Sequence, residues 1–397
     1  MSDGVRSPEV DHAPARTNAF RLGYRPQLDG MRAVAILGVM AFHASIFDGA
    51  QGGYLGVEVF FVLSGFLITT LLTQEREATG RIRLSAFYAR RALRLLPALG
   101  VFLATAAVYA LVRPHAIEVQ HFWRDFVAAI AYVANWSIAL QSYFQTRLLS
   151  HTWTLGMEEQ FYLLWPVALL FLLSRRRGRD LALAVAAGGA VAVTAWRSYL
   201  YVRGGSLPHV SFGFDTRASG LLLGAALGLA ATSGRLRVPV VVARVASIVG
   251  MFAVLLVLVS HRYGLAAISL APGREYVEGI LVADLASALL LVGLVFDDQG
   301  PVSLGFATRP MVWIGKVSYG LYLWHPFVDL AVTPDRTGLT PWLNQVVRVA
   351  LTVAVVTASY YVVELPALRR KRRFERRPDL DQPAELVDAP VPGAVVS

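Results

Sequence analysis

Long apolar segments separated by short polar ones dominate the chain. Eleven can be delimited, and they cover residues 31–48, 54–73, 95–112, 127–140, 154–173, 181–202, 213–232, 239–260, 276–296, 311–333 and 342–363. Most have about 18 residues or more, which is the length that a helix needs to cross a hydrocarbon core of about 30 Å. The pattern therefore predicts an all-α, polytopic membrane helix bundle.

The segment 127–140 is the exception, because it is too short for a comfortable crossing. If it does not cross and the N-terminus is cytoplasmic, 25 basic residues of loops and tails lie inside and seven lie outside. If it did cross, the arginine cluster at 175–179 would lie outside, against the positive-inside rule. We therefore expect about ten transmembrane helices in the plasma membrane, one short re-entrant or packed helix at 127–140, and both termini in the cytoplasm.

The two ends of the chain are polar and have no hydrophobic period. Residues 1–22 mix Pro, Ser, Asp and Arg, and residues 371–397 are first basic and then rich in Pro, Ala, Asp and Glu. Such compositions are typical of disordered segments. We expect one membrane domain over residues 23–370, flanked by two disordered cytoplasmic tails.

Composition narrows the function. Of the 397 residues, 55% are hydrophobic and 16% charged, whereas soluble domains carry about 25% charged residues, so an ordinary soluble enzyme is excluded. The chain has no cysteine, which removes disulfides, thiolate zinc sites and a catalytic thiol. The net charge of +10 is concentrated in loops and tails. It therefore indicates a topology set by the lipid bilayer and not a nucleic-acid partner.

Ionisable residues inside apolar spans are costly in a bilayer and are candidates for function. Arg32 and His43 lie in the first segment, eleven residues apart, which places them on one helix face with a rise of ~16 Å. Arg32 can be an arginine that snorkels to the interface. His43 can be a hydrogen-bonded core residue, but imidazole is also the side chain best suited to accept a hydroxyl proton near neutral pH.

Further charged residues begin or interrupt other segments. Glu158 and Glu159 open a span from the outer side, and we expect one to face the protein interior and the other an aqueous cavity, because neighbours point about 100° apart. A structural salt bridge and a catalytic role both fit Glu158. Asp215 and Arg217 begin the segment 213–232, either as an interfacial ion pair or as functional groups. His325 lies more than halfway along the segment 311–333.

A basic run lies in the loop before the third span. Arg90 and Arg94 are four residues apart and share a helix face, with Arg91 between them. Such a run can set topology, contact anionic lipid or bind a ligand with several phosphates. With Arg32 these arginines gather toward the cytoplasmic face, and a second set gathers toward the outer face: His43, Glu158, Asp215, Arg217 and His325. This asymmetry fits a phosphate-rich donor inside and an acceptor outside.

Taken in order, several of these patterns resemble the acyltransferase-3 family of integral-membrane acyltransferases, which modify sugars of the bacterial envelope and some secreted metabolites. The resemblance extends from about residue 25 to residue 370. The matching pieces are residues 25–32 with His43 eleven positions after Arg32, then 56–66, 90–94, 153–158, 215–217 and 318–325.

The resemblance implies a ten-span fold and an acyl-CoA co-substrate, most often acetyl-CoA, with no bound cofactor and no metal. It also implies that Arg32 and His43 form the family's Arg-x10-His motif and that Arg90 and Arg94 belong to its cytoplasmic basic motif. Some relatives carry an appended hydrolase-like domain. We expect that domain to be absent here, since the sequence ends about thirty residues after its last apolar segment.

These expectations combine into a hypothetical site. His43 deprotonates the acceptor hydroxyl or takes the acyl group transiently, and Glu158 orients the imidazole as a carboxylate does in a triad. The donor phosphates are held by Arg32, Arg90, Arg91 and Arg94. Residues expected on the acceptor side or in supporting roles are Asp29, Ser64, Asp215, Arg217, Tyr319 and His325.

Two alternatives stay open. The acceptor can be a carbohydrate or envelope glycan, or a hydroxylated small molecule such as a macrolide. A transporter of a polar or lipid-linked substrate is the alternative from another class, although no internal symmetry of the kind common in transporters is visible. Acyl chain length, the side of the membrane where transfer occurs and the oligomeric state are not determined by the sequence.

Overall fold

The computed structural model describes residues 20–43, 51–115, 121–140, 148–259 and 276–371, and every regular element in these ranges is a helix. The predicted all-α class is confirmed. Most of the two expected tails lies outside the described residues. Residues 20–22, however, pack on the bundle, because Leu22 is buried and the rings of Phe20 and Phe296 lie 5.6 Å apart. Apolar side chains at these positions anchor a segment that the polar composition had assigned to the N-terminal tail.

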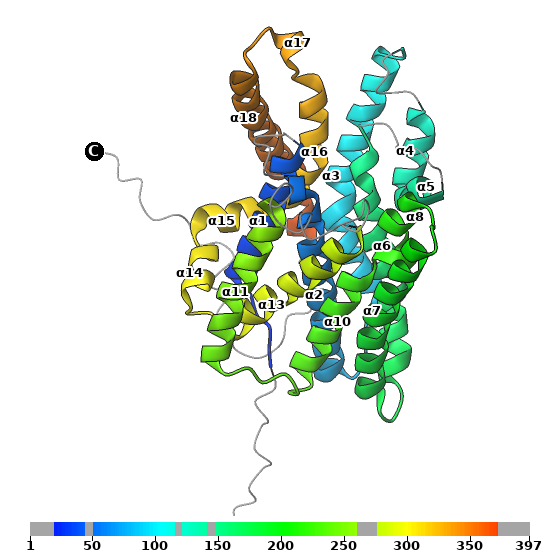
Figure 1. Ribbon diagram of the computed structural model, residues 1–397, viewed down its shortest axis with the longest axis vertical. Coiled ribbons are helices and arrows are strands. Elements are labelled where there is room, and N and C mark those ends of the chain that lie inside the picture. Colours follow the sequence, from blue (N-terminus) through cyan, green and yellow to red (C-terminus); the bar gives the residue numbers. More distant parts are fainter. Residues whose placement is uncertain (1–19, 44–50, 116–120, 141–147, 260–275, 372–397) are drawn as a thin grey trace, which may run out of the picture.

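Seven helical stretches among the described residues are long and apolar enough to cross a membrane, so the chain is a multi-pass membrane protein. Most of them run roughly along the long axis in Figure 1, whereas α13 crosses the view obliquely. The corresponding helices are α2 (Gly56–Thr79), α3 (Leu84–Val112), α6 (Trp153–Leu173), α7 (Gly178–Val202), α11 (Val240–Val259), α13 (Glu278–Phe296) and α18 (Pro341–Ser359). The last continues through a π-helical turn, Tyr360–Glu364, into α19 (Leu365–Lys371).

The other three expected spans are shorter or interrupted helices, and the count of ten crossings stays a prediction. The first is α1 (Pro26–His43), the second is α9 (Phe214–Arg217) and α10 (Ser219–Thr232), and the third is α15 (Arg309–Lys316) and α16 (Ser318–Ala331). The second begins at Gly213, whose extended backbone (φ −63°, ψ 139°) separates α9 from the preceding short helix α8 (Leu207–Phe212). Short helices α14 (Pro301–Phe306) and α17 (Pro334–Thr337) complete these connections.

The expected short segment at 127–140 consists of two helices instead of one. Helices α4 (Phe122–Ile130) and α5 (Ala134–Leu140) are separated by a turn in which Tyr132 has a positive φ of 55°. At 1.5 Å per residue neither is longer than ~14 Å, so neither can cross a bilayer. The side-chain amide of Gln160 in α6 donates to the Tyr132 carbonyl and to Asn135 Oδ1, both at 2.8 Å, and holds the turn against the bundle.

Helices α2 and α10 pack with their backbones in close contact. Gly220, Gly224 and Gly228 recur every four residues along α10, and Gly65 faces them from α2. A Cβ atom on Gly65 would overlap the carbonyl oxygen of Leu221. Small residues are what permit such close approach between membrane helices, where no hydrophobic effect drives association.

We expect Gly224→Ala to destabilise the protein, because the added Cβ would overlap the Val62 carbonyl oxygen and push α2 and α10 apart. Overpacking of this kind costs about 1–3 kcal/mol. The matched control is Gly188→Ala in α7, where a Cβ meets open space and alanine favours the helix by up to ~1 kcal/mol. Thermal unfolding of detergent-solubilised protein measures the difference, and equal melting temperatures for the two variants would contradict the proposed packing.

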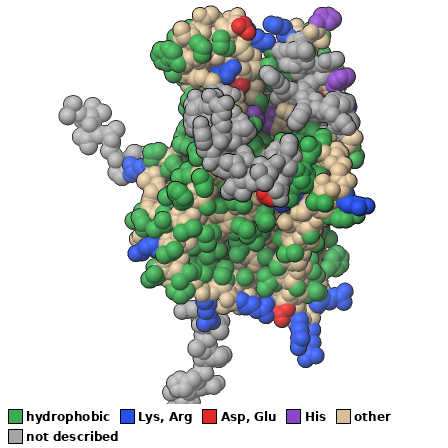
Figure 2. Space-filling model, viewed as in Figure 1, with side chains coloured by type: hydrophobic (Ala, Val, Ile, Leu, Met, Phe, Trp, Pro, Cys, Tyr) green, Lys and Arg blue, Asp and Glu red, His purple; other side chains and the backbone are tan. Residues whose placement is uncertain are grey.

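Basic side chains line one end of the molecule, the lower end in Figure 2, while apolar side chains cover its middle. The α2–α3, α6–α7 and α10–α11 connections lie at this end (Figure 1). Ion pairs join them, from Arg179 to Glu77 and from Arg235 to Asp180. The distribution agrees with the positive-inside rule for a cytoplasmic lower end, and the orientation in the membrane stays a prediction.

Candidate active site

Three histidines from different elements lie together inside the bundle. His43 ends α1, His151 lies in the short 3-10 helix Ser150–Thr152 before α6, and His325 lies in α16. The ring centroids of His43 and His325 are 4.9 Å apart, and those of His151 and His325 are 6.0 Å apart. His43 and His325 were expected to be functional, whereas His151 was missed as a site residue, because nothing in its spacing to the other two indicates contact.

His43 and His325 use their ring nitrogens in the same way. Nδ1 of His43 lies 2.9 Å from the Val39 carbonyl oxygen, and Nδ1 of His325 lies 2.9 Å from that of Leu321. A carbonyl oxygen only accepts, so each Nδ1 carries the proton of its bond and Nε2 of the neutral ring keeps its lone pair. His43 is exposed, whereas His325 is buried and its Nε2 has no hydrogen-bond partner in the described structure. The cluster therefore presents two ring nitrogens that can accept a proton.

Buried hydroxyl groups and aromatic rings surround this cluster. The Thr154 hydroxyl lies 2.6 Å from that of Tyr322, which in turn lies 2.6 Å from the His151 carbonyl oxygen. The His151 ring packs edge-on between Phe102, at 5.5 Å, and Tyr322, at 5.4 Å. These contacts hold the 3-10 helix, α3 and α16 in one arrangement and keep the histidine rings in place.

Glu158 does not orient His43, contrary to the role expected for it. Its Oε1 accepts a hydrogen bond from Ser64 at 2.8 Å, and its Oε2 lies 3.5 Å from Arg91. Glu159 also reaches Arg91, whose Nε donates to its Oε1 at 2.9 Å. The adjacent carboxylates thus converge on one guanidinium instead of facing separate environments, because the long arginine side chain lies between them.

Arg91 also joins groups that were expected at opposite faces of the membrane. It was placed in a cytoplasmic loop and Glu158 in the outer half, yet the two form an ion pair. The physical reason is that α3 begins at Leu84, so Arg91 lies about two turns inside the helix. Its guanidinium carbon lies 3.1 Å from the centroid of the Tyr162 ring, which restrains it further.

The other basic residues of the expected phosphate site differ in how far they are neutralised. Arg32 forms an ion pair with Asp29 at 3.1 Å, and Arg90 lies 3.6 Å from Glu75. Arg94 is exposed and forms no hydrogen bond or ion pair with the described part of the chain. Its strongest electrostatic neighbour is Arg32, with Arg91 as a second. The carboxylates of Asp29 and Glu364 are also among its charged neighbours. A group of arginines at one place on the surface is suited to bind an anion.

Two other supporting residues make structural contacts. Asp29 accepts a hydrogen bond from the Tyr24 hydroxyl at 3.0 Å. Burial and the nearby Asp29 carboxylate raise the pKa of Tyr24 to about 12, so that hydroxyl stays protonated and remains a donor. The Tyr319 hydroxyl donates to the Leu95 carbonyl at 3.1 Å, which fixes α16 against α3 one residue beyond Arg94.

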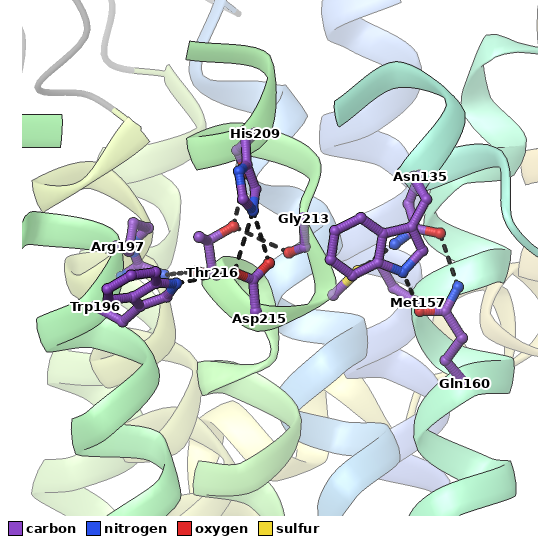
Figure 3. A network of polar contacts seen from close by, with 10 residues as sticks. Asn135, Met157, Gln160, Trp196, Arg197, His209, Gly213, Asp215 and Thr216 are labelled. Carbon is purple, nitrogen blue, oxygen red and sulfur yellow. Dashed lines mark hydrogen bonds and ion pairs between the residues drawn. The ribbon is translucent and has the colours of Figure 1, made fainter. Parts of the chain in front are cut away.

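Asp215 and Arg217 do not form the ion pair that was one of their expected roles. Asp215 accepts from Trp196 Nε1 at 2.8 Å and lies 3.0 Å from His209 Nε2 (Figure 3). Arg217 is buried and pairs with Glu58, whose Oε1 lies 2.6 Å from its Nη2. The backbone is bent at this point, between the extended Gly213 and the start of α10, and the two side chains point to different partners.

The Glu58–Arg217 pair belongs to a buried polar network that joins α2, α7, α9, α10 and α13. Ser219 donates to Asp284 at 2.7 Å, and Arg197 donates to the Ser219 hydroxyl at 3.1 Å. The buried side chains of this network thus include two carboxylates, Glu58 and Asp284, and two guanidinium groups, Arg197 and Arg217. Glu58, Arg197 and Asp284 were missed as site residues, although a charge inside an apolar segment was a signal that could have found them.

Comparisons with known proteins identify the family of the chain. Residues 25–364 match the family described as "Acyltransferase domain". The chain is 33% identical over 370 residues to the peptidoglycan O-acetyltransferase OatA of Listeria monocytogenes, covering 90% of this chain and 58% of that protein. It is 32% identical over 362 residues to the O-acetyltransferase OatA of Staphylococcus aureus, covering 89% and 58%. No solved structure matches.

The chain therefore spans somewhat more than half the length of these relatives. Among the described residues, no group of three or more His, Asp or Glu side chains is arranged to hold a metal ion. The family match covers most of the chain and includes α1, the basic run of α3 and the histidine cluster. On this evidence the chain belongs to the acyltransferase-3 family of membrane O-acyltransferases.

Proposed function

We propose that this protein transfers an acetyl group from acetyl-CoA to a hydroxyl group of a cell-envelope glycan. The observation that carries the proposal is the arrangement along α1. Arg32 and Arg94 are charged neighbours at one end of this helix, and His43 lies ~16 Å farther along it with its Nε2 lone pair available. An anion site and a base separated in this way suit a long donor with phosphates at one end and a thioester at the other.

In the proposed reaction, Arg32 and Arg94 bind the phosphates of the donor through charge-assisted hydrogen bonds. Nε2 of His43 removes the proton of the acceptor hydroxyl, whose oxygen attacks the thioester carbonyl carbon. The carbon–sulfur bond breaks, and CoA leaves as a thiolate that takes up a proton. Alternatively Nε2 itself attacks the thioester first and passes the acetyl group on. Either route uses the lone pair that the bond from Nδ1 to the Val39 carbonyl leaves on Nε2.

The glycan acceptor is proposed from the relatives, among which the Listeria monocytogenes protein is named as acting on peptidoglycan. The test uses membranes that contain this protein and acetyl-CoA labelled in the acetyl group, with the label followed into glycan, lipid-linked and small-molecule fractions. We expect label in a glycan fraction. Label in the small-molecule fraction alone would identify a small metabolite, and not a glycan, as the acceptor. If folded protein transferred label to no fraction, the proposed reaction would be refuted.

We expect Arg94→Ala to raise KM for acetyl-CoA by about 10–100-fold, which corresponds to one lost charge-assisted hydrogen bond. The KM for the acceptor should not change, because Arg94 lies at the donor end of the proposed site. Arg175→Ala is the control, since Arg175 is also exposed but lies in the α6–α7 connection. Steady-state kinetics at varied acetyl-CoA distinguishes the two variants. An unchanged KM in Arg94→Ala would remove this residue from the donor site.

A further inference from the structure

A second cluster of polar and aromatic side chains lies where the chain bends between α7 and α10. It contains Trp196 of α7, His209 of α8 and Asp215 of α9, which point toward one another (Figure 3). Asp215 Oδ2 lies 2.8 Å from Trp196 Nε1 and 3.1 Å from His209 Nε2, and its Oδ1 lies 3.0 Å from the same nitrogen. The carboxylate thus holds both rings in fixed orientations, and the mechanism proposed above uses none of these groups.

The fixed rings leave interaction surface open. Trp196 is 43% exposed, and Tyr199 stacks on one of its faces at 5.7 Å. Nε2 of His209 bonds to Asp215, so Nδ1 is the ring nitrogen that can contact a ligand. The His209 side chain is 30% exposed. A second indole, that of Trp136, has its centroid 6.0 Å from the His209 ring. The imidazole is therefore flanked by aromatic surface, and its Nδ1 has no hydrogen bond to the described residues.

An ordinary aromatic belt at the membrane interface does not account for these contacts. Belt tryptophans direct their N–H groups to lipid headgroups and water. Here the N–H of Trp196 donates to Asp215, and that of Trp136 donates to Gln160 Oε1 at 3.2 Å. Moreover, the Asp215 side chain is 37% exposed, and an exposed carboxylate cannot face acyl chains without a large cost. The cluster therefore faces water.

One ring contact links the bend at Gly213 to the segment that carries His151. Phe212, which precedes the bend at Gly213, packs edge-on against Trp153 at 5.0 Å. Trp153 begins α6 and follows His151 by two residues. The bend and the histidine cluster are therefore neighbouring parts of one packed structure.

We propose that Trp196, His209, Asp215 and Trp136 form a subsite that binds a sugar ring of the acceptor. A sugar presents an apolar C–H face, which packs on an indole, and hydroxyl groups at its edge, which hydrogen-bond to an imidazole nitrogen or a carboxylate. A quaternary ammonium ligand fits less well, because Asp215 already accepts bonds from two N–H donors and offers little uncompensated charge. The proposal rests on the proposed function, since it names part of its acceptor.

The test measures binding, so that it does not depend on turnover. Calorimetry follows titration of an N-acetylglucosamine tetrasaccharide into the purified, detergent-solubilised chain. We expect Trp196→Ala and His209→Gln to weaken binding at least about tenfold, since each removes a defined contact with the ring. Trp342→Ala is the control, because Trp342 is a 68% exposed tryptophan of α18, outside the subsite. Trp196→Phe keeps an aromatic face and should retain most of the affinity if Trp196→Ala fails to fold.

Each outcome decides between explanations. Absence of tetrasaccharide binding by the unaltered chain, or equal binding by all variants, would overturn the subsite. Competition by phosphocholine that depends on Trp196 would also overturn it, in favour of a cation site. Tetrasaccharide binding at the subsite without transfer of labelled acetyl groups would instead contradict the proposed function. Unchanged melting temperatures of the variants show that a loss of binding is local.

Discussion

Substitution of His43 by alanine is expected to lower the rate of acetyl transfer by about 10²–10⁴-fold, the usual contribution of a positioned general base or nucleophile. The hydrogen bond from Nδ1 to the Val39 carbonyl presents Nε2 as the atom that accepts either a proton or the acetyl group. Alanine removes that atom in both versions of the mechanism. The expected loss therefore does not depend on which version is correct.

The measurement compares labelled acetyl transfer by membranes that contain equal amounts of folded protein. His43→Gln is the second variant, because it keeps a polar side chain without a basic nitrogen and should lose as much activity. His115→Ala is the control, since His115 is an exposed histidine in the turn after α3. The KM for acetyl-CoA should change little, because the donor phosphates bind at the other end of α1. Full transfer by His43→Ala would refute its catalytic role.

Substitution of Glu58 by alanine is expected to destabilise the fold by about 3–5 kcal/mol, because it leaves the Arg217 guanidinium as an uncompensated buried charge. Both side chains are almost completely buried, and Arg217 also donates to the Ser211 carbonyl at 2.9 Å. The loss should exceed that of Gly224→Ala. Thermal unfolding of detergent-solubilised protein measures this loss of stability. The transfer activity per folded molecule should equal that of the unaltered protein.

The double variant Glu58→Met, Arg217→Met distinguishes the net contribution of the ion pair to stability from the penalty of leaving one buried charge unpaired. Replacing both partners of a buried ion pair with apolar side chains of similar volume is often neutral for stability. We expect it to recover most of the stability lost in Glu58→Ala. Were the double variant as unstable as the single one, the specific geometry of the pair would be needed, and the neighbouring Asp284 carboxylate would be the next residue to substitute.

Much of the fold was predictable because apolar length alone identifies membrane helices. Seven of the expected spans correspond to continuous helices, although α3 begins at Leu84, eleven residues before the expected start of its span. The interruptions were not predictable. Hydropathy does not record that Gly213 is extended or that α15 ends at Lys316 before α16 begins, since it averages over a window and contains no information on backbone conformation. Such breaks are tolerated where neighbouring helices satisfy the backbone.

The site was predictable only along single helices. The 3.6-residue period predicts that Arg32 and His43 share one helix, and α1 contains both. The period contains no information on which helices meet. It could not show that His325 lies beside His43, that Glu158 binds Ser64 and Arg91, or that the partner of Arg217 is Glu58.

The sequence by itself therefore determined that this is a helical membrane protein, which ionisable residues lie in its apolar segments, and which family it resembles. These properties follow from local quantities: segment length, hydropathy, loop charge and the period of a helix. The tertiary structure alone decided how the charges pair and which rings meet. In a low-dielectric interior each buried charge needs a partner, and that partner can come from any helix that packs within reach, however distant it is along the chain.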